Sequence, residues 1–312
     1  TYQDLTRFES SFTLYDRYGN DSLWETVLFN DSESRQVHQA LKEIYSILKA
    51  DGDVSVIEHL FVDRIDLCIY GNTKPFRIRI VNNINDNFDY FYIKNADAGR
   101  IYGLELEHIL SPNRINYLVY KNTLVEEHIA GIPGDQFIEH DMKGDDINEI
   151  RLAKEFVKFN ERTFVRLLGD MHSNNFVIDI TPDFEETHYR IRAIDFDQQS
   201  FEGKRTVYMP QYFKQNNPII ELGIKLMTPE TVRQYQREEQ SLIASRIKSS
   251  RYRLKDLIDS MTSDTLSTPK HINRLRREMS EYYRDERFLN CGGMGEIVRT
   301  SLRMLMENDR QQ

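Results

Sequence analysis

Two short polar segments, each beside an apolar stretch, carry the residues of this chain best suited to chemistry. Asp170 and Asn175 lie five residues apart in the first, residues 169–175, and Asp195 lies in the second, residues 192–197. A carboxylate can orient a hydroxyl group and accept its proton. Carboxylate and amide oxygens are also the hard ligands that Mg²⁺ prefers. An Asp followed by Asn can equally form a turn, so this pair alone leaves a structural role open.

Two expected strands, about Phe176–Ile180 and Tyr189–Ile194, would bring these segments side by side. The arrangement resembles the catalytic and metal-binding loops of the protein-kinase-like fold, in the form found in aminoglycoside and choline phosphotransferases. That family reads His-Gly-Asp-x-His-x-x-Asn and, later, Ile-Asp-Phe/Trp-Asp/Glu. This chain has Leu168 where the family usually has its first histidine.

The resemblance implies a role for each of the three polar residues. Asp170 would orient the acceptor hydroxyl and take its proton, while Asn175 and Asp195 would hold Mg²⁺ against the phosphates of ATP. The role of Asp197 stays open: it could be a second metal ligand, a support for the loop or a turn residue. His172 is expected to have a structural role.

The first half of the chain resembles the nucleotide-binding lobe of the same family. Residues 90–94 are similar to the strand that ends in the ATP-binding lysine, here Lys94, and the next helix carries Glu105 and Glu107. One of these carboxylates would hold Lys94 toward the phosphates, and the family pattern favours Glu105. Two positions on a helix differ by about 200°, so both cannot face the same lysine.

Residues 125–134 resemble the family hinge, where backbone groups meet the adenine ring. The resemblance therefore assigns nucleotide contacts to Glu127, His128 and Ile129. No Gly-x-Gly-x-x-Gly loop is present to cover the phosphates, and the turn at residues 71–74 is its best substitute. The nucleotide is expected to be ATP, with GTP left open.

Hydrophobic periodicity predicts an α+β fold in which a strand-rich half precedes a helix-rich half. The resemblance makes this a two-lobed, protein-kinase-like fold. Its expected domains are a nucleotide-binding lobe, residues 1–130, with an extra N-terminal segment, and a mostly helical catalytic lobe, residues 131–312. Expected strands are about 8–15, 23–29, 54–69, 76–81, 88–93, 115–120, 123–129, 176–180 and 189–194. Expected helices are about 35–50, 98–110, 147–168, 219–226, 229–247, 255–261, 269–281 and 296–307.

The composition of the chain limits which binding partners and which cellular compartment are expected. The 312 residues carry a net charge of −9, which argues against nucleic acid as a partner, because neutralising phosphates needs a basic surface. No stretch has the apolar length of a membrane span. With two cysteines, two reduced thiols in a cytoplasmic protein are expected.

The sequence thus predicts an ATP- and Mg²⁺-dependent phosphotransferase that moves the γ-phosphate to a hydroxyl of a small molecule. An acidic chain suits a cationic acceptor. Three alternatives remain open: phosphorylation of a protein, including the chain itself; a nucleotide-binding module that has lost transfer; and transfer of the nucleotidyl group instead of phosphate.

Overall fold

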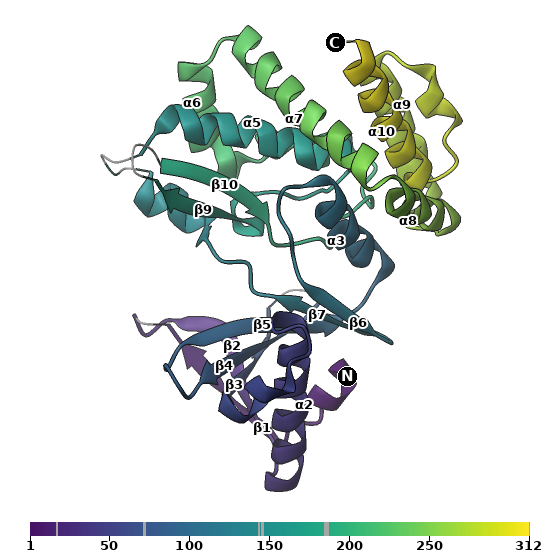
Figure 1. Ribbon diagram of the computed structural model, residues 1–312. Coiled ribbons are helices and arrows are strands. Elements are labelled where there is room, and N and C mark those ends of the chain that lie inside the picture. Colours follow the sequence, from purple (N-terminus) through teal and green to yellow (C-terminus); the bar gives the residue numbers. More distant parts are fainter. Residues whose placement is uncertain (17, 71–72, 143, 145–146, 184–186, 312) are drawn as a thin grey trace. The chain divides into compact units, whose positions relative to one another are not determined.

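The computed structural model describes residues 1–16, 18–70, 73–142, 144, 147–183 and 187–311 (Figure 1). The chain divides into two compact units. Unit 1 comprises Thr1–Asp97 and Ile115–His128, and unit 2 comprises Ala98–Arg114 and Ile129–Gln312. The expected α+β class is confirmed: strands dominate the N-terminal region and helices the C-terminal region.

The described part of unit 1 is built on a seven-stranded antiparallel sheet with the order β1-β2-β3-β4-β5-β7-β6. Its strands are β1 (Ser10–Tyr15), β2 (Asp21–Leu28), β3 (Leu60–Cys68), β4 (Phe76–Asn82), β5 (Phe88–Asn95), β6 (Tyr117–Tyr120) and β7 (Thr123–Glu127). The helices of the unit are α1 (Tyr2–Leu5), α2 (Asp31–Lys49) and a 3₁₀ turn at Val54–His59, where the sequence suggested that a strand had already begun.

One face of this sheet is apolar and the other is polar. Phe76, Ile78 and Ile80 alternate along β4 and lie in the same core as Leu41 and Leu48 of α2, so α2 covers the apolar face. Successive side chains of a strand point to opposite faces. The residues between them, on β4 and likewise on β5, therefore line the polar face.

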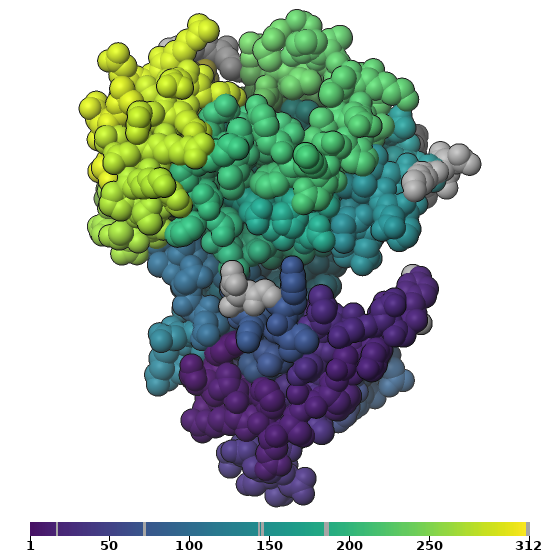
Figure 2. Space-filling view, turned by 180° about the vertical axis from the view of Figure 1, so that it is seen from behind, coloured from purple at the N-terminus to yellow at the C-terminus, as the bar shows by residue number. Residues whose placement is uncertain are grey.

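Unit 2 contains the remaining α-helices and strands of the described residues. They are α3 (Ala98–Leu110), β8 (Ile132–Pro133), α4 (Gly134–Gln136), α5 (Glu149–Val165), β9 (Phe176–Pro182), β10 (Thr187–Ala193), α6 (Asn217–Leu226), α7 (Pro229–Ser249), α8 (Arg251–Ser263), α9 (Pro269–Tyr283) and α10 (Met294–Gln311). Strands β10, β9 and β8 form a small antiparallel sheet. Short turns at 205–208, 210–212 and 214–216 connect β10 to α6. In Figure 2 the C-terminal helices, in yellow, lie beside this green connecting segment, where Arg205 stacks over the ring of Tyr282.

Helix α3 packs within unit 2, although the expected boundary near residue 130 put it in the N-terminal lobe. Leu106, Ile109 and Leu110 join the core that α5 and the C-terminal helices build. A Cβ atom at Gly103 would lie 3.1 Å from the Cβ of Phe196, so the glycine lets α3 sit directly on the segment after β10.

A buried carboxyl group on α5 makes the stability of the protein depend on pH. Burial raises the pKa of Glu161 to about 7; nearby Glu239 adds to the rise, and a hydrogen bond from Gln240 opposes it. The folded pKa exceeds the ordinary value of 4.5, so the folded state binds this proton more tightly. The resulting stabilisation is complete below about pH 4.5 and is lost as pH rises through about 7.

We expect Glu161→Gln to raise the free energy of unfolding at pH 8 by up to about 3 kcal/mol, because the variant has no buried charge to form. At pH 5 the two proteins should differ much less. Urea unfolding at both pH values measures this, and equal effects at both would contradict the assignment.

Candidate functional site

Asp170 lies in a tightly constrained segment after α5. The segment is held from both sides: the Gly169 amide donates to the Gln198 carbonyl and the Asp170 amide donates to the Val207 carbonyl. Asp170 has a φ of 61°, in the left-handed region that residues with a Cβ rarely occupy. Backbone strain of this kind gathers at functional sites.

The β9–β10 hairpin brings Asn175 and Asp195 into the neighbourhood of Asp170. Phe176 pairs with Ala193 at the end of the hairpin, and the Ile194 amide donates to the Asn175 carbonyl over 3.0 Å. The side-chain amide of Asn175 donates to the Asp170 carbonyl over 2.8 Å. The three polar residues that the sequence singles out in this half are therefore held together by one hairpin and two hydrogen bonds.

The Asp170 carboxyl group is half-buried and faces mixed charges. Burial is the main cause that raises its pKa above the ordinary value; His172 opposes the rise, and Asp195 and Glu202 add to it. His172 Nε2 lies 3.8 Å from Asp170 Oδ2. The other ring nitrogen of His172 accepts a hydrogen bond from the Asn174 amide, a local structural contact of the kind expected for this residue.

Asn175 and Asp195 offer hard oxygen ligands. The side-chain nitrogen of Asn175 donates to the Asp170 carbonyl, so the side-chain oxygen remains available to a cation. Within the described ranges there is no cluster of three or more His, Cys, Asp or Glu that could hold a metal by protein groups alone. This donor set fits Mg²⁺, which proteins commonly bind through one or two carboxylates together with substrate phosphates.

In unit 1, Lys94 lies on the polar face of the sheet. Its ammonium nitrogen is 2.7 Å from Glu126 Oε2 on the neighbouring strand β7, and both side chains are largely buried. It also lies 5.9 Å from the ring centre of Tyr92. Lys94 and Glu126 thus form an ion pair between neighbouring strands of unit 1.

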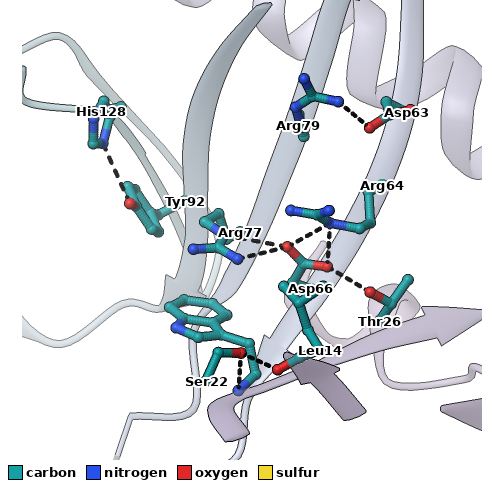
Figure 3. Close-up of polar contacts among 11 residues, drawn as sticks. Leu14, Ser22, Thr26, Asp63, Arg64, Asp66, Arg77, Arg79, Tyr92 and His128 are labelled. Atoms are coloured by element: carbon teal, nitrogen blue, oxygen red, sulfur yellow. Dashed lines mark hydrogen bonds and ion pairs between the residues drawn. The ribbon is translucent and has the colours of Figure 1, made fainter. Parts of the chain in front are cut away.

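Figure 3 shows how this polar face continues across the sheet. Asp66 has no exposed surface and binds both Arg64 and Arg77, each within about 3 Å. The guanidinium of Arg77 stacks 4.2 Å over the Trp24 ring, and the Tyr92 hydroxyl lies 3.3 Å from His128 Nδ1. Lys94 thus belongs to a charged and aromatic surface that the sequence did not indicate.

The expected hinge residues lie at the division between the units. Glu127 accepts hydrogen bonds from the Asn116 amide and from Lys49. His128 is exposed overall, but the side of its ring that lies beside Tyr90 and Tyr92 is shielded from water, and this desolvation lowers its pKa. Ile129 is buried and begins the second stretch of unit 2. Residues 71 and 72 of the substitute phosphate loop, and residues 184–186, lie outside the described residues.

The two acidic candidates on α3 have different partners within unit 2. Glu105 accepts hydrogen bonds from the exposed Arg253, at 2.7 Å and 3.0 Å. Glu107 is buried and forms an ion pair with Arg166, and Asn113 donates to its other oxygen. Glu107 thus serves the core of unit 2, while the pairing of Lys94 with Glu105 stays a prediction.

Sequence reasoning did not identify Arg100 and Glu126 as partners of the candidate residues. Arg100 on α3 forms ion pairs with Asp195 and Asp197. Only an apolar spacing that docks α3 on unit 2 could have indicated this contact, because the residues are remote in sequence. Asp197, whose role the sequence left open, therefore has a structural partner.

No known protein-family profile and no curated protein matches this chain. In the part of the chain described here, none of the helices combines the length and apolar character needed to cross a membrane.

Proposed function

We propose that this chain is a Mg²⁺-dependent phosphotransferase that moves the γ-phosphate of ATP to a hydroxyl group of a small molecule. The observation that carries the proposal is the convergence of Asp170, Asn175 and Asp195, with Asp170 held in a strained backbone conformation. Phosphoryl transfer needs little covalent chemistry from a protein and much positioning and charge neutralisation.

Each residue has a distinct task in this proposal. Asp170 orients the acceptor hydroxyl and takes its proton, for which its raised pKa makes it a better base than an exposed carboxylate. Asn175 and Asp195 hold Mg²⁺, which supplies positive charge to the phosphate oxygens. For unit 1, the family resemblance assigns phosphate contacts to Lys94 and adenine contacts to the backbone of Glu127, His128 and Ile129.

The topology of unit 1 supports this assignment. Strands β3, β4, β5, β7 and β6 are adjacent in the sheet, and the chain leaves it after β5 to form α3. Lys94 lies on the third of these five strands, which is the place of the phosphate-binding lysine in protein kinases. The protein-kinase-like fold is therefore part of the proposal.

The surroundings of Asp170 favour a cationic acceptor. Asp195 and Glu202 both act on its carboxyl group electrostatically, and Asp135 lies 3.3 Å from the side-chain nitrogen of neighbouring Asn174. A cluster of negative charge attracts cations and repels acidic substrates.

Transfer from γ-labelled ATP tests the proposal. The protein is incubated with labelled ATP, Mg²⁺ and a pool of metabolites below about 3 kDa, and the products are separated by size. We expect label in the small-molecule fraction, in a product distinct from free phosphate. Label on the chain itself would favour protein phosphorylation, and ATP binding without any transfer would favour a module that has lost catalysis.

A further inference from the structure

Arg100 places a buried positive charge against both carboxylates of the segment after β10. Its side chain is 2% exposed, and Nη1 lies 3.3 Å from Asp195 Oδ1. The same nitrogen forms an ion pair with Asp197 Oδ1. Arginine stays protonated under all conditions in which a protein is folded, so this is a permanent charge.

The packing of α3 fixes Arg100 in this position. Gly103, less than one helical turn further on, lies against Phe196, the residue between the two aspartates. Leu106 and Ile109 anchor the following turns of the same helix in the core of unit 2. The packing of α3 therefore fixes the backbone from which the buried Arg100 side chain reaches the two carboxylates.

The oxygens of Asp195 are used unequally. Oδ1 accepts from the Asp197 amide over 3.1 Å and also meets Arg100. Across the described ranges, the structure gives Oδ2 no hydrogen bond. Arg100 and the Asp197 amide thus fix the rotation of this carboxylate and leave a single oxygen for another cation.

We propose that Arg100 is a positioning residue that takes the place of a second metal ion, so that the site holds one divalent cation, through Asp195 Oδ2 and Asn175. Asp197 is then a partner of Arg100 and no metal ligand. A second divalent ion would have to displace a buried guanidinium from both carboxylates, and leaving such a charge unpaired is costly. This inference rests on the proposed nucleotide site and departs from the two Mg²⁺ ions of protein kinases.

Counting bound Mn²⁺ tests the inference. Mn²⁺ replaces Mg²⁺ and is quantified by electron paramagnetic resonance. A non-hydrolysable ATP analogue is present in excess over the protein, and the signal of Mn²⁺ bound to the free analogue is subtracted. We expect one protein-dependent Mn²⁺ per chain in the wild type and two in Arg100→Gln. The double variant Arg100→Gln/Asp197→Asn should return to one, because the second ion needs the carboxylate that Arg100 had occupied.

The single variant Asp197→Asn keeps Arg100, and it tests the same inference if Arg100→Gln does not fold. We expect its Mn²⁺ count to stay at one and its affinity to change by less than about 3-fold. Loss of a true ligand would cost more, since even residues behind the ligands are worth about 10–100-fold. Two ions in the wild type, or a large loss in Asp197→Asn, overturns the inference while supporting a nucleotide site. Absence of both analogue and Mn²⁺ binding in folded wild type overturns the proposed function as well.

Discussion

Asp170→Asn is expected to lower the rate of phosphoryl transfer by about 10²–10⁴-fold, the usual contribution of a positioned general base. The amide keeps the size and shape of the carboxyl group but cannot take the proton of the acceptor. The affinity for Mg²⁺–ATP should stay close to that of the wild type, because Asp170 acts on the acceptor. Initial rates with labelled ATP measure the first effect and calorimetric titration the second.

Asp179→Asn is the matched control, since Asp179 lies on β9 of the same hairpin and is partly exposed. It should transfer phosphate at nearly the wild-type rate. A wild-type rate in Asp170→Asn would remove Asp170 from the mechanism. Equal losses in both variants would indicate damage to the hairpin.

Glu107→Gln is expected to lower the free energy of unfolding by about 3–5 kcal/mol, the cost of removing one partner from a buried ion pair. Arg166 is almost wholly buried against Glu107, and burial lowers its pKa while the Glu107 carboxylate opposes this effect. Without that carboxylate the guanidinium charge would be buried without its counter-charge. Domains are commonly stable by about 5–15 kcal/mol, so the variant should unfold at a much lower urea concentration.

Glu105→Gln provides the control on the same helix. Glu105 pairs with Arg253, half of which is exposed, and exposed ion pairs contribute about 0–1 kcal/mol. Urea unfolding should therefore separate the two variants by several kcal/mol. Similar small effects in both would show that the Glu107–Arg166 pair does not stabilise unit 2.

Helices and strands were predicted well where the local sequence signals for them are strong. The helix at 98–110 was predicted with the bounds that the structure gives, because Ser111-Pro112 ends it. The strand that begins at Phe88 follows from its aromatic and β-branched residues. Helix α2 begins four residues earlier than expected, where the Asn30 side chain accepts from the Glu33 amide.

Long-range contacts could not be predicted in the same way. The sequence gives the apolar face of α3 but does not say which core receives it, and so α3 was expected in the N-terminal lobe. Because the contact of Arg100 with Asp195 depends on where α3 docks, it could not be predicted either. The Lys94–Glu126 pair depends on the register between β5 and β7, which places Lys94 opposite Leu124. By contrast, Asp170, Asn175 and Asp195 could be grouped from sequence, since a single hairpin joins them.

The central claim is a nucleotide site that depends on Mg²⁺ and on Asp195, and thermal unfolding with and without Mg²⁺–ATP tests it most directly. A ligand at about 100 times its dissociation constant adds roughly 2.7 kcal/mol of stability. The wild type should gain this stability only when Mg²⁺ accompanies ATP, and Asp195→Asn should lose most of the gain. A well-folded wild type that no nucleotide stabilises, with or without Mg²⁺, would contradict the account.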